Sequence, residues 1–240
     1  MTQHTLQGRT EKEVTWFQRR DVLSAAAAWV AMGGLPAATA QQRSNVVQLT
    51  GDALLNGSRL QPGQTIQTGD QVQTGPGSSL VFAMGNASFL VRQNTLMTVE
   101  RGATLNAVSL LRMVTGAVAS VWNKGGSRSI ITPTLTAGIR GTGVYAEIMP
   151  NREGRTYFCN CYGTVDLDAG GSKQVSQAQY HQSFWAEPQP NKDGTRLTSA
   201  AYLNHTDDEQ EFLAKLINQR TAWQIAGRKG NADGSGTTGY

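Results

Sequence analysis

The sequence predicts a mainly β fold, arranged as a roll, a short solenoid or a sandwich of short strands, with one C-terminal amphipathic helix. Between residues 46 and 183, short apolar runs alternate with glycine-containing turns at close intervals, a pattern typical of all-β domains. No strand of this kind can bury its apolar face alone, so we expect the strands to share a core. A separate apolar pattern with a period near 3.6 residues appears only near the C-terminus and predicts the helix.

Turn signals separate the predicted strands. Asn56-Gly57 is a hairpin turn signal. Residues 79–83 and 88–91 are two apolar runs around a glycine-containing turn, and they predict a second hairpin. We assign residues 108–122 to strand as well, because the second half of this run alternates and carries β-branched side chains.

Residues 1–40 are predicted to be an export signal that is cleaved after Ala40. Arg19-Arg20 directly precede an alanine-rich run at residues 22–35, and Ala38-Thr39-Ala40 is a small-x-small cleavage site. The arginine pair resembles a twin-arginine signal, with Gln18 where Ser or Thr is usual. An ordinary secretory signal and an uncut membrane tether are the alternatives. The apolar run is shorter than the roughly 20 residues that span a bilayer.

Cleavage at this site would leave a periplasmic or secreted chain of 200 residues, which is enough for one domain with a sizeable core. This chain would hold 17 basic and 14 acidic residues, a net charge of +3. Because the basic residues are scattered, we expect no nucleic-acid partner. Residues 41–240 contain no second long apolar run, so we expect no membrane span in the mature form.

Residues 131–145 are predicted to be central to the β region. Thr132-Pro133 gives an extended start, because the residue before a proline avoids the helical region. Three glycines then bracket one arginine. Such an arginine either binds a carboxylate or phosphate ligand or clamps groups of its own fold. We favour a structural clamp formed by Arg140, Gly141 and Thr142.

Several motifs within residues 46–149 resemble the FecR-type domain. Its turn and threonine-glycine signature is similar to Leu60-Gln61-Pro62-Gly63, Ile66-Gln67-Thr68-Gly69-Asp70 and the following residues 72–79. Its leucine-x-x-glycine-x-valine element is similar to residues 111–118, which contain Thr115-Gly116-Ala117-Val118. Its threonine-proline…alanine-x-valine-arginine-glycine-threonine hallmark is similar to Thr132-Pro133, Ala137 and Ile139-Arg140-Gly141-Thr142. The motifs occur in the family's order and spacing.

The resemblance implies an exported all-β domain. In the best-known members of the family, this domain is the periplasmic half of a regulator that signals iron-siderophore uptake across the inner membrane to a sigma factor. This chain departs from that plan, because polar residues 1–18 stand where a cytoplasmic regulatory domain would precede the apolar run. Many proteins that resemble the family are stand-alone exported domains.

Residues 150–186 are predicted to be a β extension that contains both cysteines of the chain. Residues 155–168 indicate a strand, a glycine bend and a second strand. Residues two apart on a strand face the same side, so we expect the sulfurs of Cys159 and Cys161 to point the same way.

Three interpretations of this cysteine pair stay open. Both side chains can be plain core. They can form a disulfide, which an exported compartment favours, although the extended Cα separation of about 6.5 Å needs local bending. They can also bind a metal ion with His181 and His205, because Cys₂His₂ is a standard zinc set. We expect no cofactor as the first interpretation, with zinc or iron at Cys159, Cys161, His181 and His205 as the alternative.

Residues 187–226 are predicted to form a loop followed by the C-terminal helix. Thr206 and Glu209 have the spacing of a capping box. A stripe at helical spacing follows, and we expect it to lie on the β domain as far as about Arg220: Phe212, Leu213, Leu216 and Ile217. Taken alone, His181 reads as a hydrogen-bonded core residue and His205 as part of the turn before the helix. Glycine-rich residues 227–240 are expected to be disordered.

The sequence does not show an arrangement for catalysis. Gly138, Gly141 and Gly143 lack the strand-then-helix context of a dinucleotide loop, and no nucleophile stands at a convincing spacing from a base. We therefore expect a non-enzymatic exported β domain for binding or signalling in the cell envelope, with a protein or glycan partner. The alternative is a metal-binding or redox-active envelope protein built on Cys159 and Cys161.

Overall fold

The computed structural model describes residues 44–101, 108–126, 128–150 and 152–229, which are mostly β as predicted. The predicted export signal lies outside these residues. The strands are β1 (Val46–Thr50), β2 (Ala53–Leu55), β3 (Ser58–Arg59), β4 (Gln71–Thr74), β5 (Ser79–Met84), β6 (Ala87–Val91), β7 (Leu96–Arg101), β8 (Val108–Trp122), β9 (Arg128–Ile131), β10 (Thr136–Ile139), β11 (Gly143–Ile148), β12 (Thr156–Ala169), β13 (Ser172–Ala178), β14 (Gln182–Ala186) and β15 (Leu197–Ala200). The helices are α3 (Asp207–Leu216) and α4 (Ala222–Ala226).

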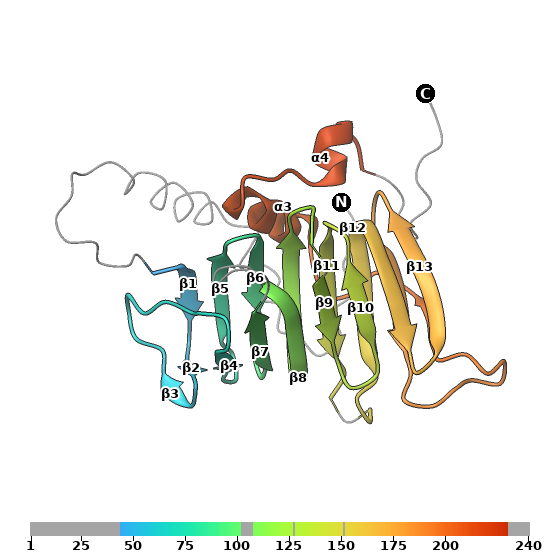
Figure 1. The fold of residues 1–240 in the computed structure, drawn as a ribbon, viewed down its shortest axis with the longest axis horizontal. Coiled ribbons are helices and arrows are strands. Elements are labelled where there is room, and N and C mark those ends of the chain that lie inside the picture. Colours follow the sequence, from blue (N-terminus) through green and yellow to red (C-terminus); the bar gives the residue numbers. More distant parts are fainter. Residues whose placement is uncertain (1–43, 102–107, 127, 151, 230–240) are drawn as a thin grey trace.

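Two long strands, β8 and β12, each belong to two sheets (Figure 1). Their halves at residues 116–122 and 156–162 join β1, β5, β6, β11, β14 and β15 in what we call the helix-side sheet. Their other halves join β2, β3, β4, β7, β9, β10 and β13 in the far sheet. All pairs are antiparallel except β8 with β9. The result is a sandwich whose corners are made by strands that switch sheets.

Glycines allow the two strands to bend. Gly116 in β8 has φ +80°, and a Cβ there would lie 2.2 Å from Thr95 Oγ1. Gly163 in β12 has φ +95°, and a Cβ there would lie 2.7 Å from the Cβ of Thr142. Positive φ and such close approach are open to glycine alone. Residues 108–122, predicted to be strand, form the continuous bent strand β8. Residues 155–168 were predicted to be two strands around a glycine bend, but residues 156–169 form one continuous bent strand, β12.

The central strands of the helix-side sheet are buried on both faces. In β11 every residue is buried: Val144 and Ala146 face the core between the sheets, whereas Tyr145 faces the other way. That second face packs against residues 201–229, which we call the C-terminal segment. Figure 1 shows α3 and α4 over this side of the molecule, and α3 contacts β6, β8 and β11.

Helix α3 begins as predicted and is tied to the sheet by polar contacts. Thr206 and Glu209 form the capping box, and the predicted apolar stripe is buried. Glu209 also pairs with Arg92, and both side chains are almost completely buried. Ser88 Oγ donates a hydrogen bond of 2.7 Å to the carbonyl oxygen of Leu213. Buried charges need such partners, because an unpaired one would carry a large desolvation penalty.

The C-terminal predictions need three corrections. Helix α3 ends at Leu216 rather than near Arg220, because Asn218 has φ +55°. The chain then forms a second helix, α4, with its own capping box at Thr221 and Gln224. The predicted loop contains strand β15, which pairs with β14. The structure describes residues 227–229 of the predicted disordered tail, and Lys229 pairs with Asp207. Residues 230–240 lie outside the described residues.

The predicted division between residues 149 and 150 falls between β11 and β12, which pair with each other.

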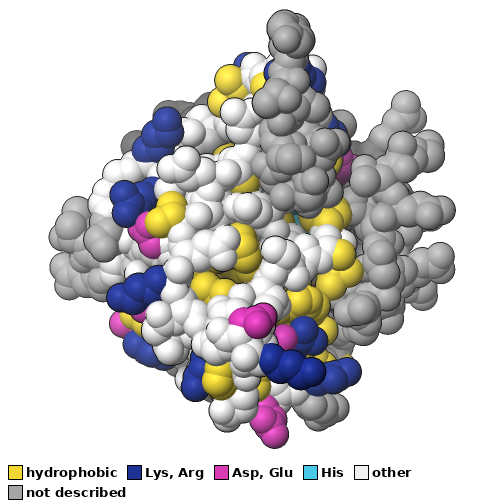
Figure 2. Space-filling view, turned by 90° about the vertical axis from the view of Figure 1, so that its right-hand side faces the viewer, with side chains coloured by type: hydrophobic (Ala, Val, Ile, Leu, Met, Phe, Trp, Pro, Cys, Tyr) yellow, Lys and Arg dark blue, Asp and Glu magenta, His cyan; other side chains and the backbone are white. Residues whose placement is uncertain are grey.

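On the face shown in Figure 2, Lys and Arg side chains are scattered among polar and apolar surface. Within the described ranges, no helix has the length and apolar character needed to cross a membrane.

We predict that Gly116→Ala costs about 3 kcal/mol or more of unfolding free energy, because the new methyl group meets Thr95 in a strained backbone conformation. Gly171→Ala is the matched control, since Gly171 has φ +94° but no atom within 4 Å of its added Cβ; it should cost about 1 kcal/mol. Denaturant unfolding of both variants gives the comparison, and equal losses would show that close packing at the β8 bend is unimportant.

Candidate metal centre

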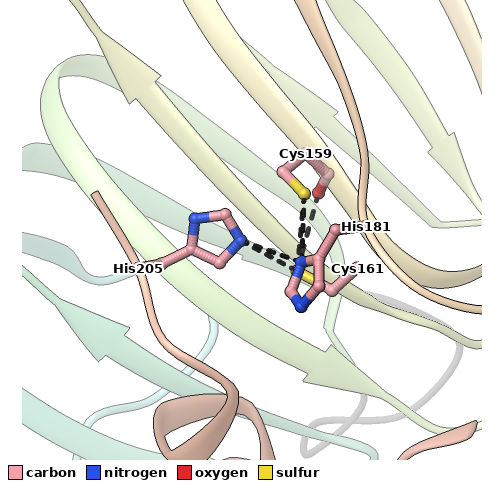
Figure 3. A group of neighbouring side chains, drawn as sticks. All are labelled: Cys159, Cys161, His181 and His205. Atoms are coloured by element: carbon pink, nitrogen blue, oxygen red, sulfur yellow. Dashed lines mark hydrogen bonds between the residues drawn. The ribbon is translucent and has the colours of Figure 1, made fainter. Parts of the chain in front are cut away.

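The structure brings Cys159, Cys161, His181 and His205 together in one cluster (Figure 3). Each offers one ligand atom, and these four atoms all lie within 4.8 Å of one another. The two Sγ atoms are 3.9 Å apart, and His181 Nδ1 is 3.3 Å from His205 Nε2. Cys159 Sγ lies 3.5 Å from His181 Nδ1, and Cys161 Sγ lies 3.4 Å from His205 Nε2.

Strand β12 presents both sulfurs to the C-terminal segment, as the two-residue spacing predicts. Cys161 sits at a β-bulge: Asn160 pairs with Val144 and Tyr162 pairs with Gly143, so Cys161 has no partner on β11. Bulges commonly re-aim a side chain.

The histidines come from two tight turns. His181 directly precedes β14 with φ +29°, and its backbone N–H donates a hydrogen bond of 2.9 Å to the carbonyl of Cys161. His205 follows Asn204, which has φ +60°. Glu147 accepts a hydrogen bond of 2.9 Å from the Asn204 side chain. Residues outside glycine with positive φ are uncommon and need support from their surroundings, which these bonds provide.

Aromatic rings enclose the cluster. The ring of Tyr145 stacks on His205 at 4.6 Å between centroids. Tyr202 lies against both imidazoles, at 4.3 and 4.4 Å, and Trp223 of α4 lies 5.3 Å from His181. Cys159, Cys161 and His181 are 0% exposed and His205 is 1% exposed. The four polar ligand atoms therefore face one another and not water.

Hydrogen-bond acceptors outside the cluster fix the orientation of both imidazoles. His181 Nε2 lies 2.8 Å from Asp207 Oδ1, and His205 Nδ1 lies 2.6 Å from the Leu203 carbonyl oxygen. An ionised carboxylate and a carbonyl only accept hydrogen bonds, so these nitrogens carry the ring protons. In the neutral rings, the lone pairs of His181 Nδ1 and His205 Nε2 then point into the cluster.

The pKa values of the two cysteines are shifted in opposite directions. Burial raises the pKa of Cys159, but the hydrogen bond from Cys161 and the two imidazoles outweigh burial and hold that pKa well below its usual value. The pKa of Cys161 is raised by burial and by the neighbouring negative charges, first among them Cys159. Negative charge is therefore favoured on Cys159 over Cys161.

Asp207 and His181 each stabilise the charged form of the other. Burial raises the pKa of Asp207, but hydrogen bonds from His181 and Lys229 outweigh burial and hold it far below its usual value. Burial lowers the pKa of His181, but the Cys159 thiolate and Asp207 raise it further than burial lowers it. A metal cation bound by both sulfurs would stabilise their negative charge directly.

The residue types of the cluster are those of a standard zinc ligand set. With Zn–S near 2.3 Å and Zn–N near 2.05 Å, an ideal tetrahedron has S···S, S···N and N···N separations of about 3.8, 3.6 and 3.4 Å. Four of the six separations here are close to these values: 3.9 Å for the sulfurs, 3.5 and 3.4 Å for two of the four sulfur–nitrogen pairs, and 3.3 Å for the nitrogens. The other two pairs, which join Cys159 to His205 and Cys161 to His181, lie within 4.8 Å.

The other two interpretations of the cysteines fit this geometry less well. Both are free thiols, and their separation of 3.9 Å is far from the disulfide bond length of about 2.05 Å. A plain apolar core would not account for the two imidazoles turned toward the sulfurs, or for the carboxylate of Asp207 on the outer nitrogen of His181.

The predicted clamp residues lie apart from this cluster. Arg140 pairs with Asp166 across β10 and β12 at 2.7 Å, but its side chain is 65% exposed, so the pair contributes little stability. Gly141 has φ +77°, and a Cβ there would lie 2.7 Å from Lys124 Cα. Thr142 is fully buried and donates a hydrogen bond of 3.0 Å to Asn160 Oδ1. Close packing in this stretch therefore rests on Gly141 and Thr142.

Sequence reasoning missed Asp207, Tyr202 and Trp223. Asp207 stands within the recognised capping box and was read as part of a helix start. A second Thr-x-x-Gln capping box at Thr221 marks α4 in the sequence, and this signal would have placed Trp223 on an ordered element.

In the chain with no ion bound, we predict that Asp207 makes stability acid-sensitive. Its folded pKa lies below its unfolded value of about 3.9, so its contribution is present above that value and is lost as the pH falls toward the folded pKa. Unfolding free energies of chelator-treated protein should fall more steeply below about pH 4 in the wild type than in Asp207→Asn. Asp208→Asn makes the same change at the exposed neighbouring position and should keep the wild-type slope; three equal slopes would contradict the prediction.

No protein-family model matches the chain, and no curated protein matches it. Among solved structures, it is similar to two crystal structures, at 2.50 and 1.65 Å resolution, described as "a putative anti-sigma factor" from Parabacteroides distasonis ATCC 8503. Their TM-scores are 0.45 and 0.44, at 13% and 12% sequence identity. The alignments cover 56% and 61% of this chain and 60% and 64% of those chains, which is less than two-thirds of their length.

Proposed function

We propose that Cys159, Cys161, His181 and His205 bind one zinc ion that holds the C-terminal segment on the helix-side sheet. One observation carries the proposal: two sulfurs and two imidazole lone pairs converge within 4.8 Å of one another at a buried position. Without a cation, two lone pairs would face each other across 3.3 Å. A buried arrangement of this kind is unfavourable unless a proton or a metal ion lies between them.

The ligand set favours zinc over other metals. Two thiolates and two imidazoles in tetrahedral array suit zinc, whereas calcium and magnesium prefer oxygen ligands. A two-iron cluster with mixed ligands places its histidines and cysteines on different irons. The sulfur–nitrogen separations of 3.4 and 3.5 Å instead suit one shared ion. Iron, the other metal considered from the sequence, is therefore the weaker candidate.

The proposed ion has a structural role. Structural zinc sites have four protein ligands, whereas catalytic sites keep one position open for water or substrate. Four ligands and almost complete burial leave no open position here. Two thiolates would balance the charge of Zn²⁺, and Lys229 balances Asp207. This arrangement supports a non-enzymatic protein.

The ion would join three segments that are distant in sequence. The cysteines belong to β12, His181 to the turn before β14, and His205 to the loop before α3. Because no such site exists in an unfolded chain, the binding free energy of the metal becomes folding free energy.

We further propose that the chain is an exported, FecR-like domain for binding or signalling in the periplasm or outside the cell. The motif resemblance over residues 46–149 and the twin-arginine-like residues 19–20 support this proposal. An envelope protein or glycan fits the expected location as partner, and the scattered basic side chains argue against nucleic acid.

Purified full-length chain, prepared under reducing conditions, should contain one zinc ion per molecule by elemental analysis. Cys159→Ser/Cys161→Ser should contain none, because two of the four ligands are lost. Substitution with cobalt(II) should give tetrahedral absorption bands and sulfur-to-cobalt charge transfer in the wild type alone. Folded wild-type protein that takes up no zinc or cobalt would refute the site.

Asp207→Asn should weaken zinc binding by about 10- to 100-fold, because the carboxylate orients His181 and increases its basicity. Asp208→Asn is the matched control and should bind zinc as the wild type does, since Asp208 is exposed and outside the cluster. Competition with a chelator of known affinity measures both, and equal affinities in the two variants would exclude a role for Asp207.

A further inference from the structure

We infer that this zinc site is a redox switch: oxidation of Cys159 and Cys161 to a disulfide releases the ion and loosens the attachment of the C-terminal segment. The inference rests on the proposed zinc site and adds to it a means of regulation. It starts from an asymmetry in the cluster, because both oxidisable ligands lie on one strand, whereas both imidazoles come from segments elsewhere.

The two sulfurs are placed to react with each other. They lie on the same face of β12, 3.9 Å apart, with one residue between them. A regular extended strand holds such residues near the upper limit of Cα separation for a disulfide. Cys161 lies in a bulge, where the ladder with β11 is already interrupted, and a bulge bends its strand. At Cys161 the backbone can therefore bend without breaking a pair with β11, although the Cys161 carbonyl oxygen still accepts the hydrogen bond from His181.

No other cysteine competes, since the chain has two in all. An intramolecular product must therefore join Cys159 to Cys161. An oxidised sulfur with a thiol beside it condenses to a disulfide, and this step competes with further oxidation to the irreversible sulfinic acid.

The reaction balances with a hydroperoxide as the oxidant. One zinc-bound thiolate attacks hydrogen peroxide; the O–O bond breaks, a sulfenic acid forms, and the hydroxide that leaves takes up a proton to give water. The second thiolate attacks the sulfenic sulfur; the S–S bond forms, and a second hydroxide leaves and is protonated. Two electrons pass from the sulfurs to the peroxide, and zinc departs unchanged as Zn²⁺.

Loss of both sulfurs removes half of the ligands in a single event. The imidazoles of His181 and His205 then remain alone, and a two-ligand site holds zinc weakly. His205 lies two residues before α3, so release of the ion would remove a cross-link between the sheet and the start of this helix. The segment would keep its apolar contacts, the Arg92–Glu209 pair and the hydrogen bonds of Ser88 with Leu213, Asn204 with Glu147 and His181 with Asp207, so its attachment would be weakened rather than lost.

The experiment treats zinc-loaded full-length protein with hydrogen peroxide and follows zinc release with a chromogenic chelator. Zinc content before oxidation is measured separately, so failure of the site itself shows as zinc-free starting material. Trypsin cleavage after Arg155 and Lys173 gives one peptide, residues 156–173, that contains both cysteines. Cys159→Ser/Cys161→Ser supplies the background for zinc bound elsewhere.

We expect one equivalent of zinc to be released, with peptide 156–173 two hydrogens lighter and resistant to alkylation. Cleavage by trypsin after Lys215 and Arg220 should accelerate at least tenfold in the oxidised native protein, and a reductant with added zinc should reverse each change. Zinc retained after oxidation, release accompanied by sulfinic acid, or a disulfide between two chains would each overturn the inference. Unchanged trypsin cleavage would overturn its structural part.

Discussion

The bends of β8 and β12 at glycine are the constraint on which the rest of the molecule depends. Gly116 and Gly163 allow each strand to serve two sheets, because no other residue fits the positive φ and the close neighbours at these positions. A sheet made in this way is apolar on both faces, so it needs a second cover besides the far sheet. The C-terminal segment is that cover, and its docking carries His205 to the sulfurs of β12.

The layer between the helix-side sheet and the C-terminal segment contains several buried polar groups. Beside apolar side chains such as Leu213, it buries Arg92 with Glu209 and the four-residue Cys/His cluster. Each buried polar group restricts how the segment can dock, since only one arrangement satisfies all of them. Apolar burial supplies the attraction between the layers, and the polar contacts select the position.

Sequence reasoning could predict features that depend on neighbours along the chain. The β class, the α3 capping box and the common direction of the two sulfurs all follow from spacings of two to four residues, and all appear in the structure. The metal cluster was one of three open alternatives, because its last ligand lies 44 residues beyond Cys161. No local pattern shows that β12 is bulged at Cys161 or that Asp207 faces His181. Strand β15 was missed because Leu-Thr-Ser-Ala has a weak apolar alternation, and its strand state depends on pairing with β14.

The late position of His205 has a consequence for biosynthesis. A ribosome completes every strand of both sheets before it makes α3 and α4. Until those residues emerge, the outer face of the helix-side sheet, with Tyr145, Tyr157 and both thiols, lacks the cover that residues 201–229 give it in the described part of the chain. The nascent protein thus passes through a stage in which an apolar surface with two oxidisable thiols is exposed, and such a surface promotes aggregation. Export after folding, the twin-arginine route, would keep that stage inside the reducing cytoplasm.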